Sequence, residues 1–168
     1  VYRSQGFKVL KIKTGLDVDQ DIERVRKLTE KFKKDMWIRV DANQGYSISQ
    51  LQQFMKETES LNIELIEQPL SVKTEHDLVL ISKEDQSKIV ADESLLDVRT
   101  ALKLSQDPKY YGVFNIKLMK CGGIKGAKAI ANIAENAGIH LFWGCNDESI
   151  VSITAALHAA YSCSNTRF

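Results

Sequence analysis

Five ionisable side chains recur along this sequence at near-equal spacing, and each stands at the end of a short apolar run. Three of them are acids and the outer two are lysines: Lys13, Asp41, Glu67, Asp92 and Lys117. The successive gaps along this series are 28, 26, 25 and 25 residues. A strand, a loop and a return helix together take about that length. The spacing therefore predicts that all five groups lie at the C-terminal ends of successive parallel strands.

The three acids of this series predict a site for a divalent metal ion. Carboxylate oxygens are the ligands that Mg²⁺ and Mn²⁺ prefer, whereas softer ions favour cysteine or histidine. We expect Asp41, Glu67 and Asp92 to bind Mg²⁺, or Mn²⁺ in its place, and to leave coordination positions for a substrate carboxylate. The C–H bond next to that carboxylate would become more acidic, because the cation stabilises the charge that remains when the proton leaves.

The two lysines flank the acids and predict proton transfer on both faces of the substrate. Lys13 could remove the proton from one face while Lys117 delivers a proton to the other. Strand alternation places Lys11 on the same side as Lys13, where its charge would favour the neutral, basic form of a neighbouring amine. An isolated acid or lysine at a strand end is usually a helix cap or a solvated side chain. Five of them at regular intervals favour a functional site.

The segments between these groups alternate between strand patterns and amphipathic helix patterns. Strands are expected at Phe7–Lys13, Met36–Asp41, Ile63–Glu67, Lys88–Asp92, Gly112–Lys117 and Ile139–Trp143. Helices are expected from Asp17 to Phe32, from Ser47 to Leu61, from Thr74 to Lys83, from Asp97 to Leu104, from Gly123 to Gly138 with Ile124 facing inward, and from Ile150 to Tyr161 with one apolar side. Val1–Gln5 is expected to end a helix, and Thr166–Phe168 to begin a seventh strand.

This alternation predicts an α/β fold in which helices cover a parallel sheet. An open doubly wound sheet would use loops from only a few strands around one switch point. Here ionisable groups end five successive strands, which favours a parallel (β/α) barrel of the TIM type. A whole barrel takes roughly 250 residues, so a chain of 168 residues is expected to be an incomplete one.

Composition excludes several other classes of protein. The chain is 43% hydrophobic and carries a net charge of +1, with acids and bases mixed along it, so neither a nucleic acid nor a membrane is expected as a partner. It shows no signal peptide and no apolar run near the roughly 20 residues that span a bilayer. The odd number of widely spaced cysteines indicates reduced thiols and a cytoplasmic protein.

Taken together, the motifs around these groups resemble a known family. They are Lys11-Ile-Lys13, Arg39-Val-Asp41-Ala-Asn43, Glu67-Gln-Pro69, Ala91-Asp-Glu-Ser94, Asn115-Ile-Lys117 and Gly122-Gly-Ile124. Across residues 1–168 they resemble the C-terminal catalytic barrel domain of the enolase superfamily, in the muconate lactonizing enzyme subgroup. The resemblance implies the metal and acid/base roles given above, with Lys11, Asn43 and Glu93 in support. It also implies that the first strand, the end of the last strand and an α+β capping domain are absent from this chain.

Within that subgroup, two further stretches are most similar to dipeptide epimerases of the L-Ala-D/L-Glu type. They are Leu118–Ile124 and the loop Gly144–Ser149. The resemblance implies an isomerase that moves a proton at the carbon next to the metal-bound carboxylate of a dipeptide. Such enzymes hold the substrate ammonium with an Asp-x-Asp pair, which would begin after Phe168. Mandelate racemase-like members place a histidine where this chain has Gly144, so that branch is disfavoured.

Several alternatives stay open. The same site would also suit a lyase or cycloisomerase, of the o-succinylbenzoate synthase or muconate lactonizing type, and a non-catalytic metal-binding barrel fragment is a third interpretation. In the loop after the sixth strand, Cys145, Asn146 and Asp147 are candidate substrate contacts, although Asp147 or Ser149 could simply cap a helix. The three histidines, His76, His140 and His158, are expected to be structural or exposed. The sequence does not determine which side chains the dipeptide substrate carries, or whether the protein forms a homo-oligomer.

Overall fold

The computed structural model describes residues 3–32 and 35–168. The chain forms two compact units, Val1–Ile89 and Val90–Phe168, called here the N-terminal and C-terminal units. At the start of the described chain, a short 3-10 helix, η1 (Arg3–Gln5), is followed by Gly6 in the left-handed conformation. The sequence predicts the end of a helix at Val1–Gln5, and of these residues Val1 and Tyr2 lie outside the described part of the chain. None of the helices in the described ranges is both long and apolar enough to cross a bilayer.

Three adjacent parallel strands make the sheet of the N-terminal unit. They are β1 (Val9–Lys13), β2 (Trp37–Asp41) and β3 (Ile63–Glu67), in that order. The register places Lys13 opposite Asp41, and Asp41 opposite Glu67. The strand ends that the spacing predicts are therefore confirmed for this unit, with the three ionisable groups level with one another.

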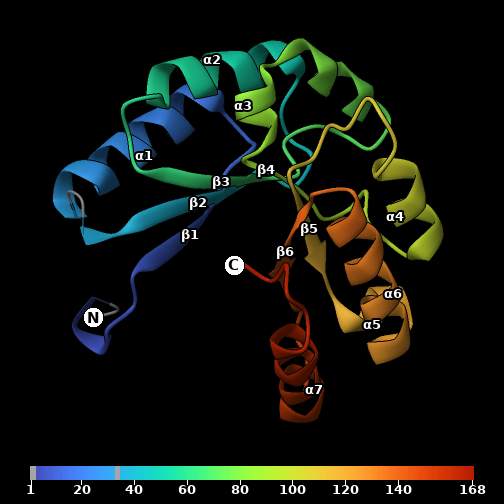
Figure 1. The fold of residues 1–168 in the computed structure, drawn as a ribbon. Helices are drawn as coiled ribbons and strands as arrows, with labels where there is room; N and C mark the ends of the chain where they lie inside the picture. Colours follow the sequence, from blue (N-terminus) through green and yellow to red (C-terminus); the bar gives the residue numbers. More distant parts are fainter. Residues whose placement is uncertain (1–2, 33–34) are drawn as a thin grey trace. The chain divides into compact units, whose positions relative to one another are not determined.

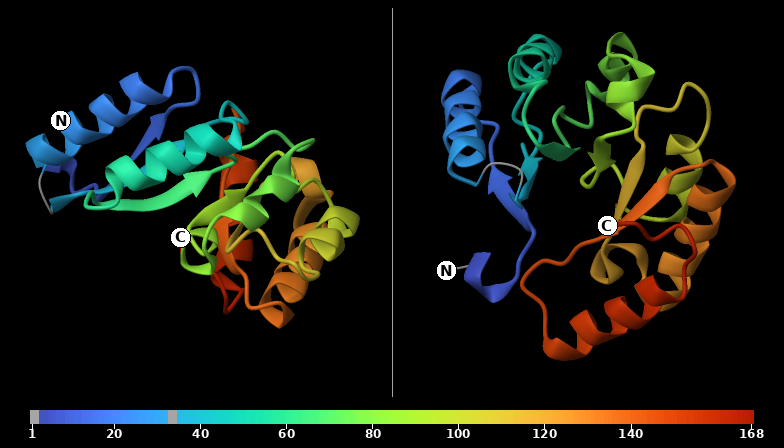
Figure 2. Two further views of the ribbon diagram at one scale, coloured as in Figure 1. Left: turned by 90° about the horizontal axis from the view of Figure 1, so that it is seen from above. Right: turned by 60° about the vertical axis from the view of Figure 1, so that its left-hand side comes forward.

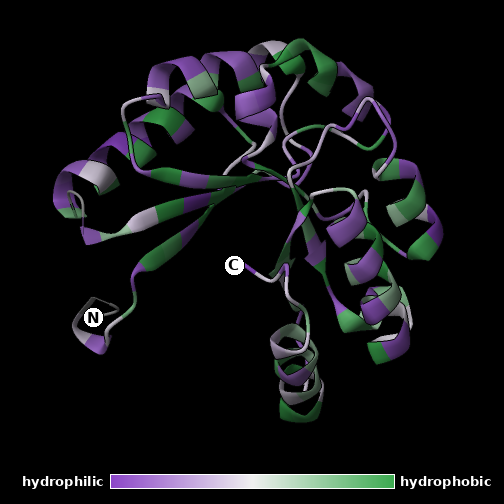
Figure 3. Ribbon diagram, in the orientation of Figure 1, coloured by the Kyte–Doolittle hydropathy of each residue, from purple (hydrophilic) through white to green (hydrophobic). Residues whose placement is uncertain are grey.

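Helices α1 (Val18–Phe32) and α2 (Ile48–Thr58) pack side by side along one face of these strands (Figure 1, Figure 2). Their inward sides carry the fully buried apolar residues, among them Ile22, Val25, Leu51 and Phe54. Hydrophilic and hydrophobic stretches alternate along both helices (Figure 3), as expected for amphipathic helices on a sheet.

Both helices begin at the caps that the sequence predicts. The side chain of Asp17 accepts the Gln20 N–H at 3.0 Å. Ser47 and Gln50 form a reciprocal capping box at the start of α2. Such caps satisfy backbone donors that the first helical turn leaves without partners.

The single helix expected over Thr74–Lys83 is wrong. The structure has a 3-10 helix, η3 (Glu75–Leu80), and then a separate short helix, α3 (Lys83–Gln86). Ile81 is extended between them, and the Ser82 side chain accepts the Asp85 N–H as a new N-cap. A strong capping residue inside the segment therefore divides it in two.

The C-terminal unit repeats the parallel arrangement with β4 (Ile89–Ala91), β5 (Val113–Ile116) and β6 (His140–Trp143). Strand β4 starts at the last residue of the N-terminal unit. Helix α4 (Val98–Leu104) begins at the predicted cap Asp97 and packs beside α6 (Gly123–Asn136) (Figure 1). An isolated parallel bridge joins Leu141 and Thr166, where the start of a seventh strand is expected.

Three features of the C-terminal unit differ from expectation. A four-residue helix, α5 (Leu118–Cys121), precedes α6 and was not predicted. Ile124 was expected to face inward but is 49% exposed, because it lies in the first turn of α6 beyond the buried stripe. The expected apolar side of α7 (Ile150–Tyr161) is also largely exposed, and the residues that this helix buries are Ala159 and Ala160. The three cysteines are free thiols, as expected.

Candidate active site

The N-terminal unit gathers two of the predicted metal ligands around one lysine. Asp41 and Glu67 end β2 and β3 and are 1% and 3% exposed. The Lys11 ammonium lies 2.9 Å from Asp41 Oδ2 and 2.5 Å from Glu67 Oε2. Two buried carboxylates on neighbouring strands therefore face the same cation. This arrangement is what a site for a bound cation requires of its oxygen donors.

Lys13 joins the same cluster from the end of β1. Its ammonium donates to Asp41 Oδ2 at 2.7 Å and to Asn43 Oδ1 at 2.8 Å. Lys11 and Lys13 share one face of β1, while Ile12 between them is buried on the other. Three predicted residues therefore contact the predicted ligand Asp41 directly. They are the predicted base Lys13, the supporting Lys11 and Asn43.

The electrostatics of this cluster favour its charged form. Burial by itself would raise the pKa of Asp41, but hydrogen bonds and charge from Lys13 and Lys11 outweigh it and hold that pKa below its usual range. Burial likewise opposes the charge on Lys11, yet the carboxylates of Glu67 and Asp41 raise its pKa above the ordinary value. Lys11 is therefore held as a cation, and its support of a neighbouring base stays a prediction.

Backbone pairing continues past the strand ends and fixes the loops that carry these groups. The Thr14 N–H donates to Asp41 O at 2.9 Å, and the Ala42 N–H donates to Glu67 O at 3.1 Å. Two residues that follow the acids, Asn43 and Gln68, have φ of 43° and 34°. Left-handed backbone at residues other than glycine costs energy, and it is typical of functional sites that the surrounding structure holds in place.

Asp21, which sequence reasoning missed, ties the loop after β1 to the loop after β2. This buried carboxylate on α1 accepts hydrogen bonds from the Gly15 N–H at 2.8 Å, the Tyr46 hydroxyl at 2.9 Å and Arg24 Nη1 at 2.9 Å. Arg24 also donates to Lys13 O at 3.1 Å. The backbone just after Lys13, from its carbonyl to Gly15, is thereby anchored to α1. An available signal was that Asp21 occupies a position on the buried stripe of α1, where an acid needs partners.

A close backbone approach joins the same two loops. Gly15 has φ of +100°, and a Cβ at this position would lie 2.1 Å from Ala42 O. Only glycine fits there, because any side chain would force the loop after Lys13 away from the loop after Asp41.

The C-terminal unit holds the third predicted ligand between two lysines. Asp92 follows β4 and is 4% exposed. The Lys117 ammonium lies 2.7 Å from Asp92 Oδ2. Lys120, from α5, lies 2.5 Å from Asp92 Oδ1 and donates to Asp92 O at 2.7 Å. Burial would raise the pKa of Asp92, but Lys117 and Lys120 outweigh it and hold that pKa below its usual range.

Lys120 was missed by the sequence reasoning. It stands three residues after Lys117, so a short helical turn brings both ammonium groups to the same carboxylate. That i, i+3 spacing was the signal available in the sequence.

The loop after β6 contacts this cluster through one of its candidate substrate residues. All three candidates are exposed, and Asn146 Oδ1 accepts from the Lys117 ammonium at 3.2 Å. Ser149, the alternative cap, accepts the Ser152 N–H at the start of α7. A Cβ at Gly144 would lie 2.4 Å from Asn115 Oδ1, so a histidine there would have to displace the Asn115 side chain.

The predicted ligands fit a magnesium ion in chemistry, since all are buried carboxylates that already attract cations. Asp41 and Glu67 are brought together in one unit, and Asp92 belongs to the other. Among the residues that the structure describes, no group of three His, Cys, Asp or Glu side chains is assembled as a metal site. The three-ligand set, and the supporting role of the half-buried Glu93, therefore stay predictions.

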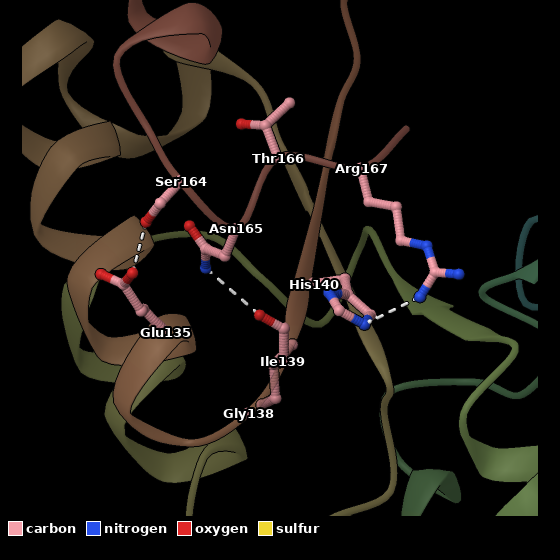
Figure 4. Close-up of a pocket in the computed structure, with 8 residues that line it drawn as sticks. All are labelled: Glu135, Gly138, Ile139, His140, Ser164, Asn165, Thr166 and Arg167. Atoms are coloured by element: carbon pink, nitrogen blue, oxygen red, sulfur yellow. Dashed lines mark hydrogen bonds between the residues drawn. The ribbon is translucent and has the colours of Figure 1, made fainter.

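One cavity of the C-terminal unit lies away from this site. It measures about 340 Å³ and lies where β6 begins, beside the last residues of the chain (Figure 4). Asn165 donates to Ile139 O at 3.2 Å there, and Arg167 Nη1 lies 3.2 Å from His140 Nε2. His140 is thus at the opposite end of β6 from the Asn146 loop, as expected. The other two histidines, His76 and His158, are exposed.

Comparison with known proteins gives consistent matches over the whole chain. The model of a family described as "Enolase C-terminal domain-like" matches residues 1–168. The L-Lys-D/L-Arg epimerase of Desulforapulum autotrophicum is 50% identical over 167 residues, which cover 99% of this chain and 47% of that protein. The chain therefore spans about half the length of the relatives it matches.

Solved structures agree with this result. The dipeptide epimerase from Methylococcus capsulatus, complexed with Mg and the dipeptide L-Arg-D-Lys, has a TM-score of 0.95 and 47% identity, covering 99% of this chain and 47% of that one. The muconate lactonizing enzyme from Pseudomonas putida has a TM-score of 0.88 and 31% identity, covering 95% and 45%. The expected α/β fold of an incomplete TIM-type barrel is confirmed, and so is the resemblance to this subgroup and its dipeptide epimerases.

Proposed function

Because the chain belongs to the enolase C-terminal domain-like family, we propose that residues 1–168 form part of the catalytic domain of a Mg²⁺-dependent dipeptide epimerase, an isomerase. The observation that carries this proposal is the level register of Lys13, Asp41 and Glu67 across three parallel strands, with Lys11 held between the two acids. A relative at 50% identity and a solved structure at 47% identity are both epimerases of dipeptides.

Asp41, Glu67 and Asp92 would hold the magnesium ion. When bound, the ion neutralises a substrate carboxylate and makes the adjacent C–H bond more acidic. The contribution of the chain is to keep the ligands ionised, which the depressed pKa values of Asp41 and Asp92 favour. The Mg of the Methylococcus capsulatus structure supports this choice of ion.

Lys13 and Lys117 would carry the proton transfer from opposite faces of the substrate. The neutral amine of one lysine takes the α-proton, the C–H bond breaks, and its electron pair delocalises into the adjoining carboxylate. The ammonium of the other lysine then gives a proton to the opposite face, and a new C–H bond forms with inverted configuration. No oxidant or co-reactant is needed. Asn43 and Asn146 would orient the two ammonium groups through the contacts described above.

The substrate class that the comparisons favour is a dipeptide with cationic side chains. The relatives that are 50% and 48% identical are both L-Lys-D/L-Arg epimerases, whereas L-Ala-D/L-Glu epimerases are 36–40% identical. We therefore rank L-Lys-L-Arg and related cationic dipeptides above L-Ala-L-Glu, the type that the sequence motifs had suggested.

Deuterium incorporation tests this function. The full-length protein that contains this chain is incubated in D₂O with Mg²⁺ and a dipeptide library that includes L-Lys-L-Arg and L-Ala-L-Glu. We expect one deuterium at one α-carbon, formation of the epimer and no change of connectivity, with cationic dipeptides exchanging fastest. The absence of exchange for every dipeptide, with turnover of muconate or an o-succinylbenzoate precursor instead, would favour a cycloisomerase or lyase. That alternative rests on the 31% identity to muconate lactonizing enzyme.

A further inference from the structure

Lys120 makes two contacts with one residue. Its ammonium lies 2.5 Å from Asp92 Oδ1 and 2.7 Å from the main-chain oxygen of Asp92, and its side chain is 17% exposed. The terminal torsion of an aspartate is soft and populates a broad range. A cation attached to both the carboxylate and the backbone of the same residue narrows that range. Asp92 Oδ1 therefore contacts Lys120, and Asp92 Oδ2 contacts Lys117.

The helix that carries Lys120 starts at Lys117 and packs closely against α6. The N–H groups of Lys120 and Cys121 both donate to Lys117 O, at 3.0 and 3.3 Å. Cys121 is buried, and a Cβ at Gly126 of α6 would lie 1.7 Å from Cys121 O. Helix α5 thus starts directly at Lys117, the residue after β5, and packs closely against α6, so Lys120 lies one turn beyond Lys117.

The N-terminal unit shows the same arrangement around Asp41. There one buried aspartate contacts Lys13, the proposed base, and Lys11, which contacts Glu67 as well. In the C-terminal unit one buried aspartate contacts Lys117 and Lys120. In the N-terminal unit the second lysine, Lys11, lies on the same strand as Lys13. In the C-terminal unit the second lysine, Lys120, lies on the helix that follows Lys117. Each unit therefore pairs a proposed acid/base lysine with a second lysine on the same ligand.

From this juxtaposition we infer that Lys120 is a positioning residue, which sets the orientation of Asp92 as a metal ligand and of Lys117 through it. The inference rests on the proposed function and adds a residue to it. Groups that hydrogen-bond a ligating carboxylate orient it, and their loss typically costs about 10–100-fold in metal affinity or activity. A lysine that served only as a competing counter-ion would have the opposite effect, because its removal would free the carboxylate for the metal.

The test is Mn²⁺ binding by the full-length protein, followed by electron paramagnetic resonance without substrate. We expect Lys120→Met to weaken Mn²⁺ binding by roughly tenfold or more and Lys120→Arg, which can still reach both oxygens, to recover much of that loss. Lys128→Met, at an exposed position on α6, serves as the matched control and should bind Mn²⁺ like the parent. In kinetics at saturating Mg²⁺, kcat should fall more than KM rises for Lys120→Met, because the orientation of Asp92 and Lys117 is lost while the metal that binds the substrate carboxylate is present.

Parental or tighter Mn²⁺ binding by Lys120→Met would overturn the inference. Circular dichroism and thermal unfolding are recorded for every variant. If Lys120→Met does not fold, Lys120→Leu, which likewise has no donor for Asp92, takes its place, and parental affinity in that variant counts equally against the inference. The parent is assayed in parallel for Mn²⁺ binding and deuterium exchange. A parent that shows neither contradicts the proposed function, whereas a parent that shows both, with an unaffected Lys120 variant, contradicts only the role of Lys120.

Discussion

Lys13 lies opposite Asp41 in the parallel register of β1 and β2, and its ammonium donates to Asp41 Oδ2 at 2.7 Å. A proposed base and a proposed metal ligand are thus positioned by the same pair of strands. The position of one cannot change without disturbing the other, because the Thr14 N–H also donates to Asp41 O. The proposed chemistry follows from this coupling of backbone and side-chain contacts.

Removing either proposed acid/base lysine should abolish epimerisation. We expect Lys13→Ala and Lys117→Ala each to lose about 10²–10⁴-fold in kcat, the usual contribution of a positioned acid or base. Each variant should still exchange the α-proton of one configuration with D₂O, and the two variants should retain opposite configurations. Proton NMR of both epimers in D₂O measures this, with the exposed Lys125→Ala as the control. Unchanged turnover in either variant would exclude the two-base mechanism.

Loss of Lys11 should destabilise the protein more without metal than with it. In the Lys11→Met variant, Asp41 and Glu67 lose the cation that they share, and we expect a loss of about 1–3 kcal/mol in the free energy of unfolding when EDTA is present. Added Mg²⁺ should recover part of that loss, because another cation then neutralises the two acids. Urea unfolding with and without Mg²⁺ measures the difference. Equal losses under both conditions would argue against a cation site at these carboxylates.

Tyr46 should stabilise the loops through its hydrogen bond to Asp21. The Tyr46→Phe variant leaves the buried Asp21 carboxylate with one donor fewer, which should cost about 1–3 kcal/mol in the free energy of unfolding. Tyr161→Phe is the matched control, because Tyr161 is 91% exposed and should tolerate the change. Chemical denaturation compares the two variants. A loss as small for Tyr46→Phe as for Tyr161→Phe would show that Asp21 does not depend on this hydroxyl.

Stability should fall in acid because of the aspartates with lowered pKa values. The folded-state pKa of Asp92 lies below its ordinary value of 3.8, so its ionised form contributes stability that is fully present above that value. The contribution is lost as the pH falls through the folded-state pKa. The unfolding free energy of the metal-free protein should therefore decline below about pH 4, and Asp92→Asn should flatten the slope. An identical slope in both proteins would mean that Asp92 does not contribute.

The stability that Lys11 contributes should fall as the pH rises, which is the opposite pH dependence to that of Asp92. Its folded-state pKa lies above the ordinary 10.5, so the stability from its charged form is present below that value and is lost as the pH rises through the folded-state pKa. Urea unfolding between pH 9 and the alkaline limit of the assay, compared for the parent and Lys11→Met, follows this loss. An alkaline decline in the variant that is as steep as in the parent, or steeper, would contradict it.

The parts of the fold that the sequence predicted are those with a regular period. Near-equal gaps between strand-ending acids and lysines indicated the strands, because each strand and its return helix need about the same length of chain. Local caps such as Asp17, Ser47 and Asp97 fixed where helices begin. Direct contacts such as Lys13 with Asp41 then followed from parallel register alone.

The parts that were missed depend on short elements or on partners far along the chain. Helix α5 has only four residues, too few to show a helical period, and Lys120 was missed with it. The role of Asp21 depends on Gly15 and Tyr46, which come from two different loops. A new cap at Ser82 divided a segment whose apolar pattern is typical of one helix.

The central proposal is that Asp41, Glu67 and Asp92 would bind one divalent cation, with Lys13 and Lys117 on either side of it. The most direct test is a crystal structure of the full-length protein with Mn²⁺ and a dipeptide, in which anomalous scattering locates the metal. The account predicts a single peak bonded to oxygens of all three carboxylates, with the two lysine side chains on opposite faces of the substrate α-carbon. A metal bound without Asp92, or both lysines on the same face, would contradict it.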